Sequence, residues 1–311
     1  AMSYLSAAFF DYPARKMVTV GITGTKGKTT TSHMIRTVLE KAGKKCGVIG
    51  TNGAFIGDEK IETQNTTPES YELHRLFHHM VEKGCEYMVM EVSSQGLKLD
   101  RTAGIEFDYG VFENITPDHI GPTEHADFDE YLYCKSLLFT QCRVGIINRD
   151  DEHWQEILKD NTCERIVTFG TEKTADLYAT DICHVAGKGE LSMKFRAGGL
   201  FEGDIIVGLP GRFNILNAMC AICVCVELGI ERNDILHALE HVKVRGRVEK
   251  VPVSEDFTVL IDYAHNEVSS RSILTTLREY NPGRIVSIFG CGGNRSRDRR
   301  FTMGEAIGEL S

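Results

Sequence analysis

The sequence lacks the segments that would take a protein into or across a membrane. No apolar run reaches the ~18 residues that a membrane-spanning helix needs. The stretch from Met2 to Phe10 is short and has no basic start, unlike a secretory signal. There is also no internal repeat and no low-complexity tract. These absences predict a protein of the cytoplasm that does not use a membrane.

A second cysteine pair is also missing. Cys220 and Cys223 form one C-x-x-C, but a zinc ribbon needs two such pairs. The ten cysteines are scattered, several inside apolar runs, which favours free thiols in a reducing compartment. The formal net charge of −9 argues against nucleic acid as the main partner, although a local basic pocket for phosphate remains compatible with it. No convincing Ser-His-Asp or Cys-His set is present.

What is present is an alternation of strand and helix patterns. Short β-branched runs such as Met17–Thr23 and Tyr87–Val92 alternate with helical spacing in 31–41, 129–139 and 214–228. This order predicts an α/β fold with a doubly wound, mainly parallel sheet. The glycine-broken region 176–208 predicts a small antiparallel addition, and the strand–helix–strand pattern at 258–289 predicts the start of a second Rossmann-like α/β domain. We expect a linker over 1–16, a central domain over 17–244 and part of another domain over 245–311.

The strongest local signal is a glycine-rich turn between the first strand and the first long helix. It consists of Gly24, Thr25, Lys26, Gly27, Lys28, Thr29 and Thr30. Such a loop directs backbone N–H groups at phosphate oxygens, Lys28 would reach the β- and γ-phosphates, and Thr29 offers a hydroxyl to Mg²⁺. Ile22 stands where the generic phosphate-loop pattern has a glycine, so a tight turn rich in lysine and threonine is the alternative.

The form T-G-T-K-G-K-T-T-T resembles the loop of Mur ligases and folylpolyglutamate synthetases. Further stretches occur in the family order: NTTPES, MEVSSQGLKLDR, VFENITPDHI, YLYCKSLLF, LPGRFNILNAMCAI, VRGRVEKV and IDYAHNE. They resemble most the Mur branch that adds the third residue of the peptidoglycan stem peptide. The resemblance implies an ATP-dependent ligase, in which a carboxylate forms an acyl phosphate that an amine attacks. It also implies that a uridine-binding domain would precede Met2 and that an amino-acid-reading stretch would follow Ser311.

The resemblance assigns roles to residues that the patterns alone leave open. Lys28, Glu91, His119 and Lys135 would be catalytic, and two Mg²⁺ ions would be held by Thr29, Glu91, His119 and a Lys135 carbamylated by CO₂. Thr66, Thr67, Ser93 and Arg101 would hold the UDP-N-acetylmuramoyl dipeptide. Asn217 would meet adenine, Arg247 the γ-phosphate and Asp262 the ribose. The patterns alone allow other interpretations. Glu91 is as readily a solvated residue at a strand end, His119 a structural side chain, and Lys135 a solvated lysine on a helix. Thr67 could cap a helix, as could Asn217 or, more convincingly, Asn214.

Several positions depart from the family pattern and concern the acceptor more than the nucleotide. They are Gln95, the stretch Gly121 to His125, the run Asn266-Glu267-Val268 and the segment 294–300. The family expectation is a monomer that joins an amino acid (lysine or diaminopimelate are the usual ones) to UDP-N-acetylmuramoyl-L-Ala-D-Glu. A related ligase acting on folylpolyglutamate or poly-glutamate is the nearest alternative, and a non-catalytic nucleotide-binding subunit is the next.

Overall fold

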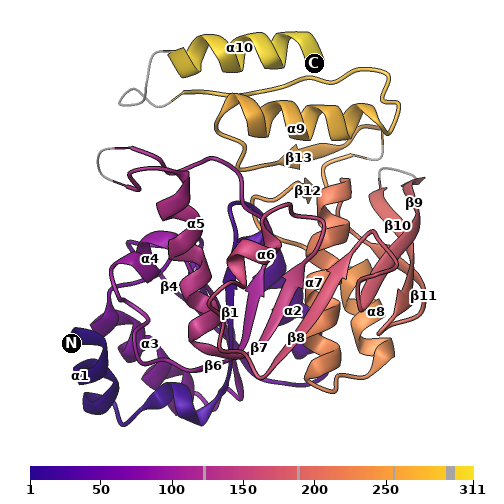
Figure 1. Cartoon of the computed structure of the whole chain (residues 1–311). Helices are drawn as coiled ribbons and strands as arrows, with labels where there is room; N and C mark the ends of the chain where they lie inside the picture. Colours follow the sequence, from indigo (N-terminus) through magenta and orange to yellow (C-terminus); the bar gives the residue numbers. More distant parts are fainter. Residues whose placement is uncertain (122–123, 188–189, 255, 292–297) are drawn as a thin grey trace.

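The computed structural model (Figure 1) describes residues 1–121, 124–187, 190–254, 256–291 and 298–311. The departures at Pro122 and Thr123 and at Asn294 to Arg297 therefore lie outside the described residues. A single large sheet forms the centre, in the order β11-β10-β9-β8-β7-β6-β1-β5-β2-β3-β4. A separate two-stranded sheet, β12-β13, belongs to the C-terminal part of the chain.

The middle of the large sheet is parallel. Its parallel strands are β1 (Val18–Thr23), β2 (Cys46–Gly50), β5 (Tyr87–Glu91), β6 (Phe107–Phe112), β7 (Cys142–Asn148) and β8 (Arg165–Gly170). β1 lies between β5 and β6, so the ends of these three strands meet at one edge. The predicted doubly wound, mainly parallel sheet is confirmed.

Antiparallel strands extend the sheet at both sides. On one side are β3 (Gly53–Ile56) and β4 (Glu59–Ile61), and on the other β9 (Leu177–Gly187), β10 (Glu190–Gly199) and β11 (Gly203–Val207). β9 joins β8 in parallel before the chain turns back into the antiparallel strands. The predicted antiparallel region is therefore confirmed, and it continues the main sheet.

Helices cover both faces of the sheet. One face carries α2 (Lys28–Lys41), α7 (Arg212–Glu227) and α8 (Arg232–Glu240). The other carries α3 (Ser70–Glu82), α4 (Ser94–Lys98), α5 (Phe128–Ser136), the 3₁₀ turn η2 (Leu137–Thr140) and α6 (Trp154–Ile157). α1 (Met2–Phe9) and the 3₁₀ turn η1 (Pro13–Lys16) precede β1, and α1 packs on α3.

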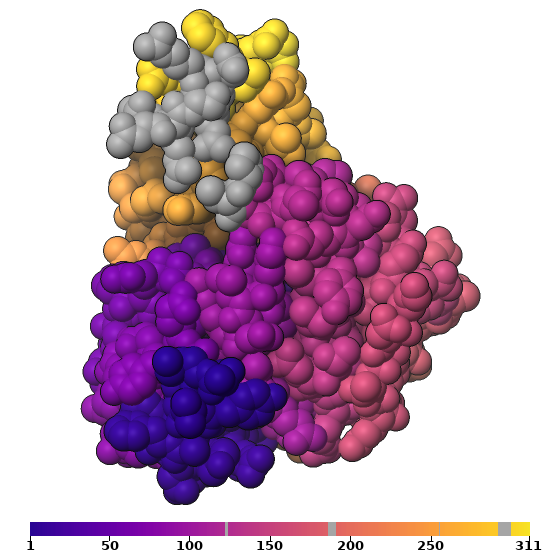
Figure 2. Space-filling view, turned by 60° about the vertical axis from the view of Figure 1, so that its left-hand side comes forward, coloured from indigo at the N-terminus to yellow at the C-terminus, as the bar shows by residue number. Residues whose placement is uncertain are grey.

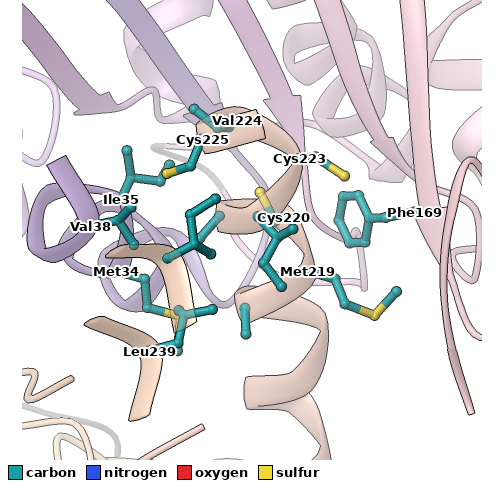
Figure 3. Packing of buried hydrophobic residues seen from close by; sticks show 14 of the residues in the cluster. Met34, Ile35, Val38, Phe169, Met219, Cys220, Cys223, Val224, Cys225 and Leu239 are labelled. Carbon is teal, nitrogen blue, oxygen red and sulfur yellow. The ribbon is translucent and has the colours of Figure 1, made fainter. Parts of the chain in front are cut away.

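Alternation along the strands supplies both cores. In β5, Val89 packs toward α2 while its neighbours Met88 and Met90 pack toward α3, the period-two pattern of a strand covered on both faces. Helix α7 is buried almost throughout, and its cysteines lie among apolar side chains of one core cluster, which includes Ile35 on α2, Leu239 on α8 and Phe169 on β8 (Figure 3). Cys220 and Cys223 therefore fill a core, as small apolar side chains do.

The C-terminal part contains β12 (Glu249–Val251), β13 (Val259–Ile261), α9 (Glu267–Arg278) and α10 (Asp298–Leu310). It has a small apolar cluster of its own around Leu274, Met303 and Ile307. It lies across one end of the large sheet, and α1 lies at the opposite end of the molecule (Figures 1 and 2). The domain limits at 16/17 and 244/245 remain a prediction.

Three local predictions differ from the structure. The run 284–289 was expected to form a strand, but it forms none, and Ile288 within it is 99% exposed. The helix that follows NTTPES begins at Ser70 with Glu69 as N-cap, so Thr67 caps nothing and its hydroxyl bonds the end of β5. α7 is capped by Gly211, so neither Asn214 nor Asn217 is a helix cap.

Candidate functional site

The glycine-rich loop joins β1 to α2 at the edge where the parallel strands end. Gly27 has a φ of 96°, a left-handed conformation that favours glycine, and Lys28 is the first residue of α2. A Cβ atom at Gly27 would lie 2.1 Å from Oε2 of Glu113. The loop therefore needs glycine here both for its conformation and for space.

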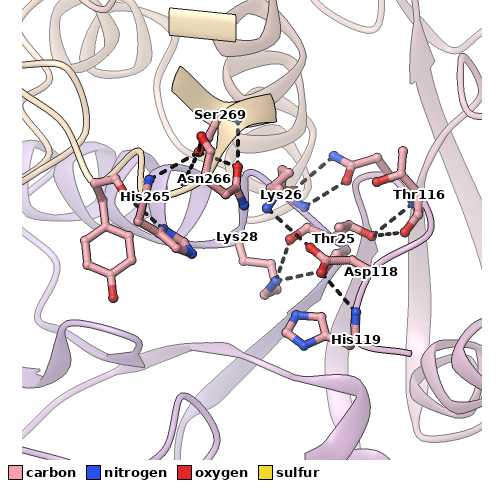
Figure 4. Close-up of polar contacts among 12 residues, drawn as sticks. Thr25, Lys26, Lys28, Thr116, Asp118, His119, His265, Asn266 and Ser269 are labelled. Carbon is pink, nitrogen blue, oxygen red and sulfur yellow. Dashed lines mark hydrogen bonds and ion pairs between the residues drawn. The ribbon is translucent and has the colours of Figure 1, made fainter. Parts of the chain in front are cut away.

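The amine of Lys28 folds back over the loop (Figure 4). It donates to the backbone oxygens of Gly24 at 2.7 Å and Thr25 at 3.3 Å. Burial lowers the pKa of Lys28, while the carboxyl groups of Glu91 and Glu113 raise it. A bound phosphate group would offer this amine a better acceptor than two neutral carbonyls.

Glu91 lies at the end of β5, directly beside the start of α2. Its carboxylate is 1% exposed and accepts from the hydroxyl of Thr29 at 2.8 Å. It also accepts from the backbone N–H of Thr51 at 2.9 Å and from the Thr51 hydroxyl at 3.1 Å. The structure thus brings Thr29 and Glu91 together, and the bland interpretation of Glu91 as a solvated strand end is wrong.

Lys135 lies on α5 and points under the phosphate loop. It is 1% exposed, its amine donates to the backbone oxygen of Gly24 at 2.8 Å, and it lies 4.6 Å from the centre of the Tyr131 ring. Burial holds the pKa of this amine well below its ordinary range. Lys135 is therefore not the solvated helix lysine that its amphipathic pattern favours.

His119 is placed differently. Its side chain is 49% exposed and Nδ1 lies 2.9 Å from a carboxylate oxygen of Glu124. Its neighbour Asp118 pairs with Lys26 at 3.4 Å across the loop. Within the described part of the chain, no three His, Cys, Asp or Glu side chains come together as a metal-binding group. His119 and Glu91 are thus not joined in one cluster.

The four residues expected to hold an acceptor form a connected network. The Thr67 hydroxyl donates to the backbone oxygen of Glu91 at 3.0 Å and accepts from the N–H of Ser93 at 2.9 Å. Arg101 donates to the backbone oxygen of Thr67 at 3.0 Å and pairs with Glu69. The Thr66 hydroxyl lies 3.1 Å from that of Thr51, so the network reaches Glu91 from a second side.

A pocket lies between the C-terminal part of the chain and the β2–β4 strands of the large sheet. Arg245, Gly246, Arg247 and Tyr263 line it from one side, and the β2–β3 turn and the β3–β4 hairpin line it from the other; its volume is about 300 Å³. Arg247 lies 4.9 Å from the centre of the Tyr263 ring. Asp262 accepts from the backbone N–H groups of Val248 and Ala264, both at 2.8 Å, which fixes the start of the C-terminal part beside the pocket.

One buried acid at the loop has no role in the sequence-based prediction. Glu113 follows β6, is 3% exposed, and has a pKa raised to about 8 chiefly by burial. A carboxylate directly after an apolar strand is the same signal that Glu91 gives. Its place beside β1, however, requires the strand order, which the sequence alone does not provide.

Comparisons with known proteins agree with this geometry. Residues 22–225 match the Mur ligase middle domain, and residues 246–311 match the Mur ligase glutamate ligase domain. The chain is 40% identical to a UDP-N-acetylmuramoyl-L-alanyl-D-glutamate–2,6-diaminopimelate ligase of Clostridium acetobutylicum, over 100% of this chain and 64% of that protein.

Solved structures give the same result. A structure of a UDP-N-acetylmuramoyl-L-alanyl-D-glutamate–2,6-diaminopimelate ligase superposes with a TM-score of 0.80 at 25% identity, covering 100% of this chain and 64% of that chain. The folylpolyglutamate synthase of Mycobacterium tuberculosis shares the fold, with a TM-score of 0.73 at 18% identity over 89% of this chain and 70% of that one. The chain spans 64% of the length of the first of these relatives. It belongs to the Mur ligase family.

Proposed function

We propose that this protein carries the nucleotide-binding core of an ATP-dependent ligase that joins an amino acid to the D-Glu carboxylate of UDP-N-acetylmuramoyl-L-Ala-D-Glu. The observation that carries the proposal is the convergence of Lys28, Thr29 and Glu91 at the phosphate loop. The relatives named for this acceptor and for 2,6-diaminopimelate make diaminopimelate the first amino acid to test.

The protein's own residues would act by binding and by neutralising charge. The Lys28 amine would bind the β- and γ-phosphates instead of the loop carbonyls. Arg247 would approach the γ-phosphate from the C-terminal part of the chain. Asn217 would contact adenine and Asp262 the ribose, so closure of the C-terminal part would complete the site. No residue is needed as a covalent nucleophile, because the acceptor carboxylate itself attacks the γ-phosphate.

One magnesium site fits the structure. The Glu91 carboxylate and the Thr29 hydroxyl are hard oxygen donors 2.8 Å apart, beside the place where phosphate groups would lie. When bound there, Mg²⁺ would neutralise the charge that develops on the transferred phosphoryl group. The second ion would need a carbamylated Lys135 together with His119. His119 turns to Glu124 in this structure, so we derive no step from a second ion.

The remaining expectations form part of the same proposal. Among the described residues, no helix is long and apolar enough to cross a membrane. All ten cysteines are free. A cytoplasmic location, a monomeric state and the absence of nucleic acid as a partner stay predictions.

The experiment uses the intact protein with ATP, Mg²⁺, bicarbonate and UDP-N-acetylmuramoyl-L-Ala-D-Glu. Phosphate release is measured with each amino acid of a panel that includes diaminopimelate and lysine, and each product is identified by mass spectrometry. Turnover that requires both the nucleotide sugar and one amino acid is the expected result. Turnover with a folate or poly-glutamate acceptor alone would identify the related ligase instead, and ATP binding without any turnover would identify a non-catalytic subunit.

A further inference from the structure

The carboxyl group of Glu113 is buried, where a negative charge would be costly. It lies directly after β6, next to β1, and both of its carboxyl oxygens are buried without a hydrogen-bond partner. The Thr31 hydroxyl is near enough to lower the pKa of Glu113 but makes no hydrogen bond of normal geometry. An unpaired buried acid is costly, so a neighbour must compensate for it or the acid must be uncharged.

The carboxyl group packs against the phosphate loop. The Cβ position of Gly27 lies 2.1 Å from Glu113 Oε2 and 2.6 Å from Asn217 Oδ1. Both oxygens therefore occupy the same side of Gly27. A single small space holds the end of β6, the turn of the loop and the first turns of α7.

Hydrogen bonding with Asn214 fixes the orientation of the Asn217 amide group. Asn214 donates through Nδ2 to the backbone oxygen of Pro210 at 2.7 Å, and that oxygen can only accept. The Oδ1 of Asn214 then accepts from Nδ2 of Asn217 at 2.9 Å. Asn217 is left with its acceptor oxygen toward Gly27 and Glu113. Two acceptor oxygens attract each other only with a hydrogen atom between them.

The groups around Glu113 allow its carboxyl group to be protonated, so that Glu113 itself supplies this hydrogen atom. Burial and, less strongly, Glu91 on β5 raise the pKa of this carboxyl, whereas Thr31 and Lys28 on α2 and Lys135 on α5 lower it, and the net result is a pKa of about 8. Cys220 on α7 faces it as a thiol whose pKa is itself raised by burial. The uncharged acid is therefore accessible near neutral pH.

We propose that Glu113 is a positioning residue of the nucleotide site, whose uncharged carboxyl group donates a hydrogen bond to Asn217 and so fixes α7 against the phosphate loop. This inference rests on the proposed nucleotide binding, since Asn217 is the residue that would contact adenine. Glu113 itself need not touch the nucleotide. It sets the separation between the phosphate-binding turn and the adenine-binding amide.

The test is the dissociation constant for ADP of the intact protein, measured by calorimetry for Glu113→Gln and Glu113→Ala. Glutamine donates an N–H to the same oxygen, so Glu113→Gln should bind ADP within about twofold of the wild type. Glu113→Ala has no donor and should bind about tenfold more weakly, the effect of losing one hydrogen bond in a buried site. Glu106→Gln and Glu106→Ala, at the exposed opposite end of β6, are the matched controls and should not change the affinity.

A double variant separates positioning from general loss of structure. If Glu113 acts through Asn217, Glu113→Ala should weaken binding little further in an Asn217→Ala background. The inference is overturned if Glu113→Gln binds as weakly as Glu113→Ala, which would show that the charge matters, or if Glu113→Ala binds like the wild type. If wild type and Lys28→Ala alike fail to bind ADP, the proposed function itself is wrong.

Discussion

Lys135 shows how strongly a residue depends on its surroundings. It is the last-turn basic residue of α5, a position that commonly interacts with solvent and the helix end, yet it is 1% exposed beneath Gly24. A buried amine with a lowered pKa is uncharged more often at neutral pH, and the uncharged amine is the form that reacts with CO₂. The chemistry implied by the family resemblance is therefore physically accessible at this site.

We expect a carbamate on Lys135. Isotopically labelled bicarbonate added to the wild type should give a carbamate signal by NMR, and Lys135→Met should remove that signal. Lys159→Met, which changes an exposed lysine, is the control and should leave it unchanged. A signal that survives in Lys135→Met would place the carbamate on another amine.

Glu113 should make stability depend on pH. Its pKa in the folded protein is raised from 4.5 to about 8, so folding favours the protonated acid. The resulting stabilisation is complete below about pH 4.5 and is lost as the pH rises through about 8. Urea unfolding of the wild type and of Glu113→Gln at about pH 5.5 and about pH 8.5 should show a larger loss in the wild type. Equal losses in both proteins would show that Glu113 titrates normally.

At the scale of elements, α7 connects the site to the core. Its first turns carry Asn214 and Asn217 near the loop, and its later turns are buried against α2, with which it makes extensive contact. A helix buried on nearly all sides shows little amphipathic periodicity, and its cysteines lie within a continuous apolar run of the sequence. Packing along α7 should therefore matter more to stability than any single polar contact at its start.

Ile222 tests the importance of packing along α7. Ile222 on α7 is 0% exposed, and Ile222→Ala should lower the free energy of unfolding by about 2–5 kcal/mol, through lost transfer energy and the cavity left behind. Leu99→Ala, at a residue that is 55% exposed, should cost far less. Both are measured by urea denaturation. Similar values for the two variants would contradict the burial of α7.

Across the whole molecule, Tyr280 and Glu279 are described residues of the C-terminal part that contact the antiparallel edge of the sheet. The Tyr280 hydroxyl donates to the backbone oxygen of Ser192 at 2.7 Å, and Glu279 lies 2.8 Å from Nε2 of His184. The C-terminal part has a small apolar cluster of its own, which favours relative motion of the two parts. Such motion would allow the closure that we propose for the nucleotide site.

Tyr280→Phe should loosen this junction without unfolding either part. Removal of one hydrogen bond should cost about 0.5–1.5 kcal/mol. Hydrogen exchange should become faster in α9 and remain unchanged in α7. Faster exchange throughout the sheet would show instead that the two parts unfold as one unit.

Several elements of the fold can be predicted from short stretches of the sequence. The phosphate loop, the flanking β1 and α2, and the alternation of strands and helices all depend on residues close together in sequence, where glycine conformation and hydrophobic period act directly. β2, which contains cysteine and two glycines, was missed, and the run 284–289 was wrongly expected to pair, because pairing depends on a partner strand that propensity does not specify.

Which side chains meet depends on the arrangement of the strands in space. Thr29 and Glu91 are 62 residues apart, and Lys135 is 111 residues from the Gly24 oxygen that it contacts. The order of parallel strands brings them to one edge, and burial there changes their charge states. Neither strand order nor burial can be read from a residue's neighbours in sequence, so the burial of Lys135 and Glu113 follows from the fold, whereas the phosphate loop follows from the sequence itself.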